Sequence, residues 1–251
     1  MLTSQRKREI LDTLTRDGQV IAKTLSERYA VSEDTIRRDL RELAAEGLLQ
    51  RVHGGALPAS PAAADLSVRE NLSSPSKERI ARTAAQLVAP GQTIILDGGT
   101  TSIQLVRCLP KTLAATVVTH SPNVAVELAG HRDIEVILIG GRLFRHSMVT
   151  VGAAAIEALG HVRADMFFMG VTGVHLRGGL STGDLEEAYV KRALSVQAAE
   201  TIVLATIEKI NAASRCKIGD IGLANSMVLE RDTPADFVAE LERLGITVVL
   251  A

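Results

Sequence analysis

The sequence predicts an α/β protein with two folded parts, a small helical unit followed by a larger domain around a mostly parallel sheet. Seven short apolar runs alternate with helical patterns between residues 93 and 250, and three amphipathic segments occupy residues 1–57. Alternation of this kind is typical of α/β domains. Residues 58–74, rich in Pro, Ala and Ser, are interpreted as a linker, and residues 75–251 as the larger domain.

Composition narrows the class of protein. The chain has 251 residues, a formal net charge of −1 and 46% hydrophobic residues, an apolar fraction that excludes global disorder. No apolar run approaches the about 18–20 residues that a membrane span needs, and the charged N-terminus lacks the apolar stretch of a secretory signal. Cys108 and Cys216 lie far apart, and the histidines show no metal-ligand spacing. We therefore expect a cytoplasmic protein without membrane, metal or cofactor.

Three helices are expected in the first unit. The first covers residues 4–16 and the second residues 21–29, with a short turn after it. Ser32 is a favoured residue at the start of a helix, and two acids follow it where the helix dipole favours negative charge. Gly47 is a favoured residue beyond a helix end, so the third helix should run from Ser32 to the residue before Gly47.

The third helix has one apolar face and one polar face when its residues are placed 100° apart around the helix axis. Its apolar face carries Ile36, Leu40 and Leu43, and the opposite face with its flanks carries Thr35, Arg37, Arg38 and Arg41. A short helix, a tight turn and a helix of this kind are typical of a helix-turn-helix. Arginines on its outer face suit DNA phosphates and guanine edges, although a solvated surface is the commoner reason for such a face.

The segment after the third helix predicts a β-hairpin wing. Residues 48–56, LLQRVHGGA, read as a short strand followed by a Gly-Gly turn, which would place Arg51 and His53 near a DNA backbone. Residues 1–57 hold ten Lys and Arg against nine Asp and Glu, so local net charge decides little. The combination of three helices, turn and wing favours DNA binding over a merely solvated face.

The larger domain should contain a mostly parallel sheet covered on both faces, because its apolar β-branched runs are separated by helices. The expected strands are residues 93–97, 116–120, 134–140, 165–171, 201–206, 226–230 and 246–250. In such sheets ligands bind beyond the carboxyl ends of the strands. The turn at 97–102, DGGTTS, lies there and could hold a phosphate on a helix N-terminus, although the same turn could simply cap a helix.

The motifs of the first unit resemble the DeoR family of bacterial transcription regulators. They are Arg6, spaced apolar residues, SEDTIRRDL at 32–40 and RVHGGA at 51–56. The resemblance implies a winged helix-turn-helix that binds double-stranded operator DNA through Thr35, Arg37 and Arg38, to which the helix face and the wing add Arg41, Arg51 and His53. For Asp39 we expect a pair with a neighbouring arginine at helical spacing.

The resemblance continues through the motifs DGGTT, THS, IGGR, GLSTGDLEEAYVKR and IEKI of the larger domain. It implies an effector-sensing domain similar to the sugar-phosphate isomerase and acyl-transferase superfold. By this resemblance, the phosphate end would be held by Asp97, Gly99, Thr100 and Thr101, and the rest would be lined by Ser121, Gly141, Thr182, Glu187, Lys191 and Lys209. Lys77 and Arg69 fit the family's bridging segment.

Three residues depart from the family pattern. His120 stands where the family usually has Asn, Thr206 where an Asp is common, and Glu208 where it has Ser. An acid next to Lys209 would weaken an anion site by removing favourable charge.

The expected function is that of a homo-oligomeric regulator, a repressor of sugar-metabolism genes whose affinity for DNA responds to a sugar phosphate. Two alternatives stay open. One is a regulator that senses an unphosphorylated ligand, which the departures at positions 206 and 208 favour. The other is a sugar-phosphate isomerase-like enzyme with an accessory DNA-binding head, in which Glu187 and Lys191 act as acid and base, although the same spacing is that of an ordinary ion pair on a helix surface.

Overall fold

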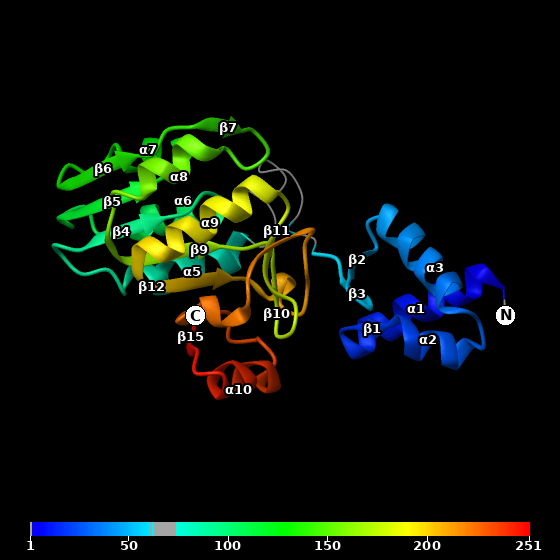
Figure 1. Cartoon of the computed structure of the whole chain (residues 1–251). Coiled ribbons are helices and arrows are strands. Elements are labelled where there is room, and N and C mark those ends of the chain that lie inside the picture. Colours follow the sequence, from blue (N-terminus) through cyan, green and yellow to red (C-terminus); the bar gives the residue numbers. More distant parts are fainter. Residues whose placement is uncertain (1, 61, 63–73) are drawn as a thin grey trace.

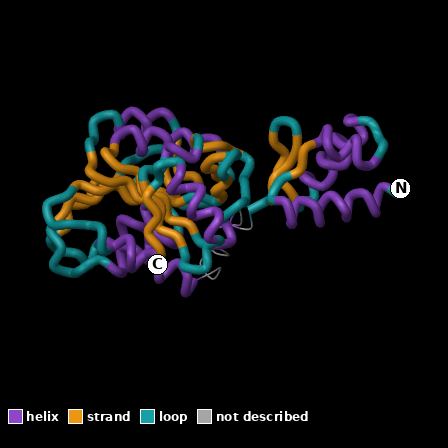
Figure 2. Tube along the Cα trace, turned by 90° about the horizontal axis from the view of Figure 1, so that it is seen from below, coloured by secondary structure: helices purple, strands orange, loops and turns teal. Residues whose placement is uncertain are grey.

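The computed structural model describes residues 2–60, 62 and 74–251 and shows two bodies. Figures 1 and 2, seen at right angles to each other, show a small N-terminal body and a larger C-terminal one with a narrow neck between them. We call residues 2–58 the N-terminal domain and residues 74–251 the C-terminal domain. Most of the expected linker lies outside the described residues, so the boundaries at 57, 58 and 74 stay predictions.

The N-terminal domain contains the three expected helices and the wing. Its elements are α1 (Thr3–Asp17), β1 (Val20–Ile21), α2 (Ala22–Tyr29), α3 (Glu33–Ala45), β2 (Leu49–Val52) and β3 (Gly55–Pro58). The strands form an antiparallel sheet in the order β1-β3-β2, in which β2 and β3 are the hairpin of the wing. The two-residue strand β1, which pairs with β3, was not predicted.

Local signals in the sequence explain where α3 begins and which face it buries. Ser32 caps it, because its side-chain oxygen accepts a hydrogen bond from the Thr35 backbone N–H at 3.2 Å. Ala30, with a φ of 51°, makes the left-handed turn that separates α2 from α3. Ile36 and Leu40 are buried in the apolar core of this domain, which confirms the assignment of the apolar face.

Asp39 corrects one prediction. Its carboxylate does not pair with an arginine at helical spacing on α3; it accepts two hydrogen bonds from Arg6 of α1, at 2.6 Å from Nε and 3.2 Å from Nη2. Both side chains are buried, and their hydrogen bonds hold the pKa of Arg6 above its usual value. The pair therefore joins two helices that are 33 residues apart in the chain, a contact that helical spacing alone cannot reveal.

The C-terminal domain is built on a seven-stranded sheet whose strands all run parallel, as predicted. The strands are β4 (Thr93–Leu96), β5 (Ala115–Thr119), β6 (Ile134–Leu138), β9 (Ala164–Gly170), β12 (Ala198–Ala205), β14 (Ser226–Leu229) and β15 (Thr247–Leu250). Their order is β15-β14-β12-β9-β4-β5-β6, so the chain reverses its direction of travel across the sheet between β4 and β9. Such a reversal is where open α/β sheets bind ligands.

Helices cover both faces of this sheet (Figure 1). One layer consists of α5 (Ser74–Ala85), α6 (Thr100–Cys108) and α7 (Pro122–Leu128), and the other of α8 (Ala153–Leu159), α9 (Leu185–Gln197) and α10 (Ala235–Arg243). Successive strand residues alternate between the layers: Phe167 faces one apolar cluster and Phe168 the other. The continuous apolar runs in the sequence follow from burial on both faces.

Several elements beside the main sheet were not predicted. They are the hairpin of β7 (Arg142–Phe144) and β8 (Val149–Val151), and an antiparallel sheet of β10 (Gly173–His175), β11 (Gly179–Thr182) and β13 (Cys216–Gly219). Short 3-10 helices, η2 (Ile207–Lys209) and η3 (Ile221–Leu223), follow β12 and β13. Among the described residues, no helix has the length and apolar character to span a membrane.

The two domains are joined by backbone hydrogen bonds as well as by the chain itself. Beyond β3, Ala59 forms an isolated parallel bridge with Ala213. The Ala213 N–H donates to the Pro58 carbonyl oxygen at 2.9 Å, and the Ser60 N–H donates to the Ala213 carbonyl oxygen at 3.2 Å. Pro58, Ala59 and Ser60 are thus fixed to the C-terminal domain, so a shift of the segment between η2 and β13, which carries Ala213, would be passed to the wing.

Candidate functional site

The predicted DNA-contacting side chains all reach the surface. The side chains of Arg37, Arg38 and Arg41 on α3 are exposed, as are those of Arg51 and His53 on the wing. Thr35, in the first turn of α3, is half-buried, and its hydroxyl oxygen lies 3.0 Å from that of Ser32. The arrangement has the form of a winged helix-turn-helix, whose recognition helix enters the major groove.

Arg37 is held by acids that precede it on α3, a feature that the sequence analysis missed. Its guanidinium nitrogens lie 2.7 Å from a carboxylate oxygen of Glu33 and 3.2 Å from one of Asp34. Both pairs are exposed, so each contributes little to stability. The two ion pairs nevertheless orient the Arg37 side chain toward the start of α3. The i,i+4 spacing from Glu33 to Arg37 is the sequence signal that could have indicated the pair with Glu33.

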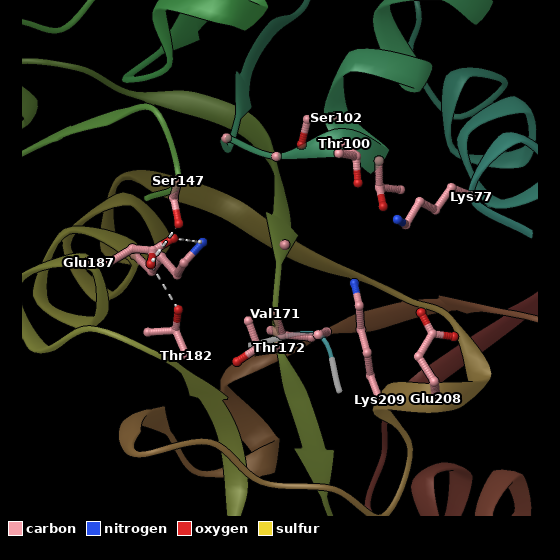
Figure 3. Close-up of a pocket in the computed structure, with 16 residues that line it drawn as sticks. Lys77, Thr100, Ser102, Ser147, Val171, Thr172, Thr182, Glu187, Glu208 and Lys209 are labelled. Atoms are coloured by element: carbon pink, nitrogen blue, oxygen red, sulfur yellow. Dashed lines mark hydrogen bonds and ion pairs between the residues drawn. The ribbon is translucent and has the colours of Figure 1, made fainter. Parts of the chain in front are cut away.

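A pocket lies at the carboxyl ends of β4 and β9, where the strand order reverses. Figure 3 shows it between the turn that starts α6, the end of β9 and η2. The lining residues are Ala62, Lys77, Gly98, Gly99, Thr100, Thr101, Ser102, Ser147, Gly170, Val171, Thr172, Thr182, Glu187, Lys191, Glu208 and Lys209. Seven of the ten predicted effector residues are therefore brought together here: Gly99, Thr100, Thr101, Thr182, Glu187, Lys191 and Lys209.

The start of α6 supplies one wall of the pocket. Gly99 has a φ of 110°, a backbone conformation that L side chains rarely adopt, and it leaves the helix N-terminus uncovered. The first N–H groups of an α-helix have no partner within the helix and carry partial positive charge. The side chains of Thr100 and Thr101 lie in this first turn, so the wall offers both N–H and hydroxyl donors to an anion.

The pocket is polarised from side to side (Figure 3). Lys77 of α5 and Lys209 of η2 lie on one side of it, together with Glu208, while Ser147, Thr182 and Glu187 lie on the opposite side. Lys77 and Lys209 are both buried apart from their exposure to the pocket. One side therefore offers two ammonium groups beside the Glu208 carboxylate. The other offers hydroxyl groups and the Glu187 carboxylate, which is paired with Lys191, and these groups can hydrogen-bond to a polyhydroxylated ligand.

Asp97 does not line the pocket, and its expected role as a phosphate-holding residue is corrected by its position. It is completely buried beneath the pocket, and its Oδ1 accepts hydrogen bonds from His120 Nε2 at 2.9 Å and from the Gly98 N–H at 2.8 Å. Its Oδ2 accepts from the Gly170 N–H at 2.8 Å and from Lys191 Nζ. Three of these donors belong to pocket-lining residues, so Asp97 holds the parts of the pocket together from behind.

Lys191 and Glu187 extend this buried network into the pocket. Lys191 Nζ lies 3.4 Å from Glu187 Oε1, and Glu187 Oε2 accepts a hydrogen bond from Thr182 Oγ1 at 3.0 Å. Both charged side chains are buried, which rules out the ordinary surface pair as the explanation of their spacing. Burial opposes the charged form of Lys191, but Asp97 and Glu187 outweigh it and hold the pKa of Lys191 above its usual value.

Burial likewise opposes the ionised form of Asp97. The charge of Lys191 and the hydrogen bond and charge of His120 outweigh that effect and hold the pKa of the Asp97 carboxyl far below its usual range.

Two further predicted residues lie outside the pocket. Ser121 is buried, and its hydroxyl donates to the Met148 carbonyl oxygen at 3.2 Å, which ties β5 to the loop before β8. Gly141 has a φ of 147° and begins the β7–β8 hairpin, where a Cβ atom would come within 2.9 Å of the Val151 carbonyl oxygen. Both follow strands at the β5–β6 side of the sheet, and the pocket is centred on β4, β9 and β12.

Several pocket residues were missed or left without a role. Lys77 matches the family's bridging segment, so the resemblance could have indicated that it belongs to the pocket. Ser147 and Thr172 come from segments without a motif, and no sequence signal pointed to them. Glu208 Oε1 accepts a hydrogen bond from Thr206 Oγ1 at 2.6 Å. Its Oε2 is buried and has no hydrogen-bond partner among the described residues.

The described residues contain no group of three or more His, Cys, Asp or Glu side chains arranged to hold a metal ion. The expectation that the protein needs neither a metal nor a cofactor stays a prediction.

Solved structures with a related fold are distant. Ribose 5-phosphate isomerase A from Methanocaldococcus jannaschii is 19% identical, with a TM-score of 0.40 over 53% of this chain and 53% of that chain. Nothing about activity follows from a similarity of this size.

Curated relatives match along almost the whole chain. It is 32% identical to the HTH-type transcriptional regulator GlpR of Haloferax volcanii, over 99% of this chain and 98% of the relative. It is 30% identical to the glycerol-3-phosphate regulon repressor of Escherichia coli K12, over 96% of each chain. These relatives are named as regulators, which agrees with the expectation that the chain is a regulator and not an isomerase.

Two family models cover both domains. The model of the DeoR-like helix-turn-helix domain matches residues 6–61, and the model of the DeoR C terminal sensor domain matches residues 73–231. The exposed arginine face, the pocket at the strand reversal and these matches lead to one assignment. The chain belongs to the DeoR family of DNA-binding transcription regulators, with an N-terminal helix-turn-helix and a C-terminal sensor domain.

Proposed function

We propose that this regulator represses genes of sugar metabolism in the cytoplasm and that a sugar phosphate bound in the pocket changes its affinity for operator DNA. The observation that carries the proposal is the polarity of the pocket, with the start of α6, Lys77 and Lys209 on one side and Thr182 and Glu187 on the other. A phosphate group fits the first side and sugar hydroxyls fit the second. The name of the E. coli relative, a glycerol-3-phosphate regulon repressor, supports the same class of effector.

The route from pocket to DNA runs through the junction between the domains. Thr172 lines the pocket, and its carbonyl oxygen accepts a hydrogen bond from the Ser60 hydroxyl. Ala62, two residues further on, lines the pocket itself. Ser60 is the second residue after the wing, and its backbone N–H is hydrogen-bonded to Ala213. A ligand that moves this wall of the pocket therefore also moves the base of the wing.

Pairing of two or more copies completes the proposal, since a symmetric oligomer can place two recognition helices on two half-sites of an operator. Support comes from β6, one of the two edge strands of the seven-stranded sheet. Its residues Val136, Ile137 and Leu138 are exposed at 36%, 39% and 49%. An exposed apolar edge strand is a template for pairing with another chain, and size-exclusion chromatography with light scattering measures the number of copies.

A panel of ligands tests the proposal. Thermal unfolding is measured with ribose 5-phosphate, glucosamine 6-phosphate and glycerol 3-phosphate, each beside its unphosphorylated counterpart. A ligand at 100 times its Kd stabilises the folded state by about 2.7 kcal/mol. Stabilisation by at least one phosphorylated compound, but not by its counterpart, is expected.

Binding to the DNA upstream of the regulator's own gene is then measured with and without the stabilising compound. The Lys209→Gln variant should lose the response to that compound, whereas Lys111→Gln, which removes an exposed charge outside the pocket, should keep it. If no phosphorylated compound stabilises the protein or changes its affinity for DNA, the proposal is wrong.

A second candidate effector is an unphosphorylated ligand that carries a hydrogen-bond donor or an amine. The observation that favours it is the buried Glu208 Oε2, which no described residue satisfies and which lies in the lining of the same pocket. Stabilisation by an unphosphorylated member of the panel alone would select this candidate.

A further inference from the structure

His120 lies beneath the pocket at the end of β5 and is completely buried. Its Nδ1 lies 3.0 Å from the Thr150 carbonyl oxygen, and its Nε2 lies 2.9 Å from Asp97 Oδ1. Each ring nitrogen therefore faces one oxygen at hydrogen-bond distance, and the chemistry of these two oxygens determines which nitrogens carry a proton.

A carbonyl oxygen only accepts hydrogen bonds, so Nδ1 must donate to Thr150 and must carry a proton. Asp97 Oδ1 also accepts a hydrogen bond from the Gly98 N–H at 2.8 Å. If neither Nε2 nor Oδ1 carried a proton, two lone pairs would face each other at 2.9 Å in a buried site. A proton therefore lies between His120 and Asp97.

The surroundings of Asp97 decide which of the two holds that proton. Besides His120, three donors surround the carboxylate: the Gly98 N–H on Oδ1, and the Gly170 N–H and Lys191 Nζ on Oδ2. Three donors, one of which is the Lys191 cation, stabilise an ionised carboxylate and oppose its protonation. The proton therefore belongs to the imidazole ring.

We infer that His120 is a buried imidazolium that neutralises Asp97 and thereby sets the charge of the effector pocket. The four groups form a chain of alternating charge in the order His120, Asp97, Lys191 and Glu187, joined by contacts of 2.9 Å at its start and 3.4 Å at its end. With a charged His120 the chain is neutral. With an uncharged residue in its place, the chain would carry one net negative charge directly behind the pocket.

This charge matters for an anionic effector, so the functional part of the inference rests on the proposed function. The ionisable groups that line the pocket are Lys77, Glu187, Lys191, Glu208 and Lys209. A charge buried near such a site is weakly screened and alters the binding of an anion. His120 contacts Asp97 and not the pocket, so it acts as a positioning residue.

Glu208 adds a further carboxylate to the pocket lining, outside the chain of four groups. No charge in that chain balances it, so the charges of Glu208 and His120 act in opposite directions on a bound anion.

The protonation state is tested directly on the full chain by nitrogen NMR with selectively labelled histidine at pH 7, with the His120→Asn variant to assign the signal. The inference predicts that both ring nitrogens of His120 carry protons. A neutral ring, with one nitrogen unprotonated, would overturn it. This measurement needs no ligand, so it decides the inference even if the proposed effector class is wrong.

The effect on the pocket is tested by titrating inorganic phosphate in thermal unfolding experiments. We expect the His120→Asn variant to bind phosphate about tenfold more weakly than the wild type. His161→Asn, a change of the same kind at an exposed position, should bind it unchanged. Adding Glu208→Gln to His120→Asn should restore binding to within about threefold of the wild type, because it removes the second unbalanced charge.

Equal phosphate binding by His120→Asn and His161→Asn would contradict the role of His120 in setting the charge. If the wild type binds neither phosphate nor any sugar phosphate, the proposed function fails, and the NMR result still decides the state of His120.

Discussion

Ser60, the second residue after the wing, donates its hydroxyl hydrogen to the backbone carbonyl oxygen of Thr172, which lines the pocket at the ends of β4 and β9. The same hydroxyl oxygen accepts a hydrogen bond from the Ala62 N–H at 3.1 Å. One side chain thus connects the segment below the DNA-binding domain to the pocket wall.

The Ser60→Ala variant should uncouple the two sites. It removes the bonds to Thr172 and to the Ala62 N–H but leaves the other pocket residues and the DNA-binding face in place. Allosteric coupling typically changes affinity about 5- to 150-fold. In Ser60→Ala we expect this factor to fall to about twofold or less, measured as the ratio of operator Kd values with and without a stabilising sugar phosphate. Ser76→Ala, which also removes a hydroxyl, is the control; an unchanged ratio in Ser60→Ala would show that the coupling takes another route.

Loss of the buried Arg6–Asp39 pair should destabilise the N-terminal domain. Removing one partner of such a pair leaves an uncompensated buried charge and typically costs about 3–5 kcal/mol. Hydrogen exchange of the α1 and α3 amides in Arg6→Met should therefore be much faster than in the wild type. Arg8→Met, at an exposed position on the same helix, should leave exchange nearly unchanged. Equal exchange in the two variants would mean that the pair contributes nothing.

Asp97 should make the C-terminal domain sensitive to acid. Lys191 and His120 hold the pKa of its carboxyl far below the unfolded value of about 3.9. A lowered pKa in the folded state adds stability above the unfolded pKa, and this stability is lost as the pH falls below about 4. Asp97→Asn should lower the free energy of unfolding at pH 7 by about 3–5 kcal/mol.

The stability of Asp97→Asn should also fall less between pH 5 and pH 3 than the stability of the exposed control Asp133→Asn, because the control still contains Asp97. The range of about pH 5 to 3 is chosen because the lowered pKa of Asp97 makes its contribution to stability decline there. Urea unfolding at each pH measures both quantities, and identical pH profiles for the two variants would refute the assignment.

Removing the acid of Glu208 should strengthen the binding of a simple anion. The side chain lies in the pocket lining with Lys77 and Lys209, and Glu208→Gln removes a negative charge with little change of shape. We expect inorganic phosphate to bind about three- to tenfold more tightly, as read from thermal shifts. Glu186→Gln, on the first turn of α9 and outside the pocket, should have no such effect. Weaker phosphate binding in Glu208→Gln would show that the carboxylate supports the anion site through another group.

The seven parallel strands and the helix-turn-helix could be predicted because each depends on local sequence patterns. The run 166–169 is apolar at every position because both faces of its strand are buried. The two faces of α3 can be told apart from the spacing of its apolar residues alone. The turn at Gly99 could be predicted for the same reason, because a glycine between a strand and a helix leaves the helix N-terminus open.

The remaining features depend on contacts that are distant in sequence. A motif places Asp97 at the end of a strand, but it does not say whether the side chain points into the pocket or beneath it. That choice is set by His120 and Lys191, which follow 23 and 94 residues later. The partner of Asp39 was mistaken for the same reason, since Arg6 lies on another helix.

The most direct test of the account concerns the outer face of α3. Binding to the DNA upstream of the regulator's own gene is measured by fluorescence anisotropy at moderate salt for the wild type, Arg37→Ala/Arg38→Ala and the exposed control Arg132→Ala. Each bidentate base contact is worth about 1–3 kcal/mol, so we predict at least about 30-fold weaker binding by the double variant and unchanged binding by the control. If the double variant binds this DNA as tightly as the wild type, α3 is not the recognition helix, and the account is contradicted.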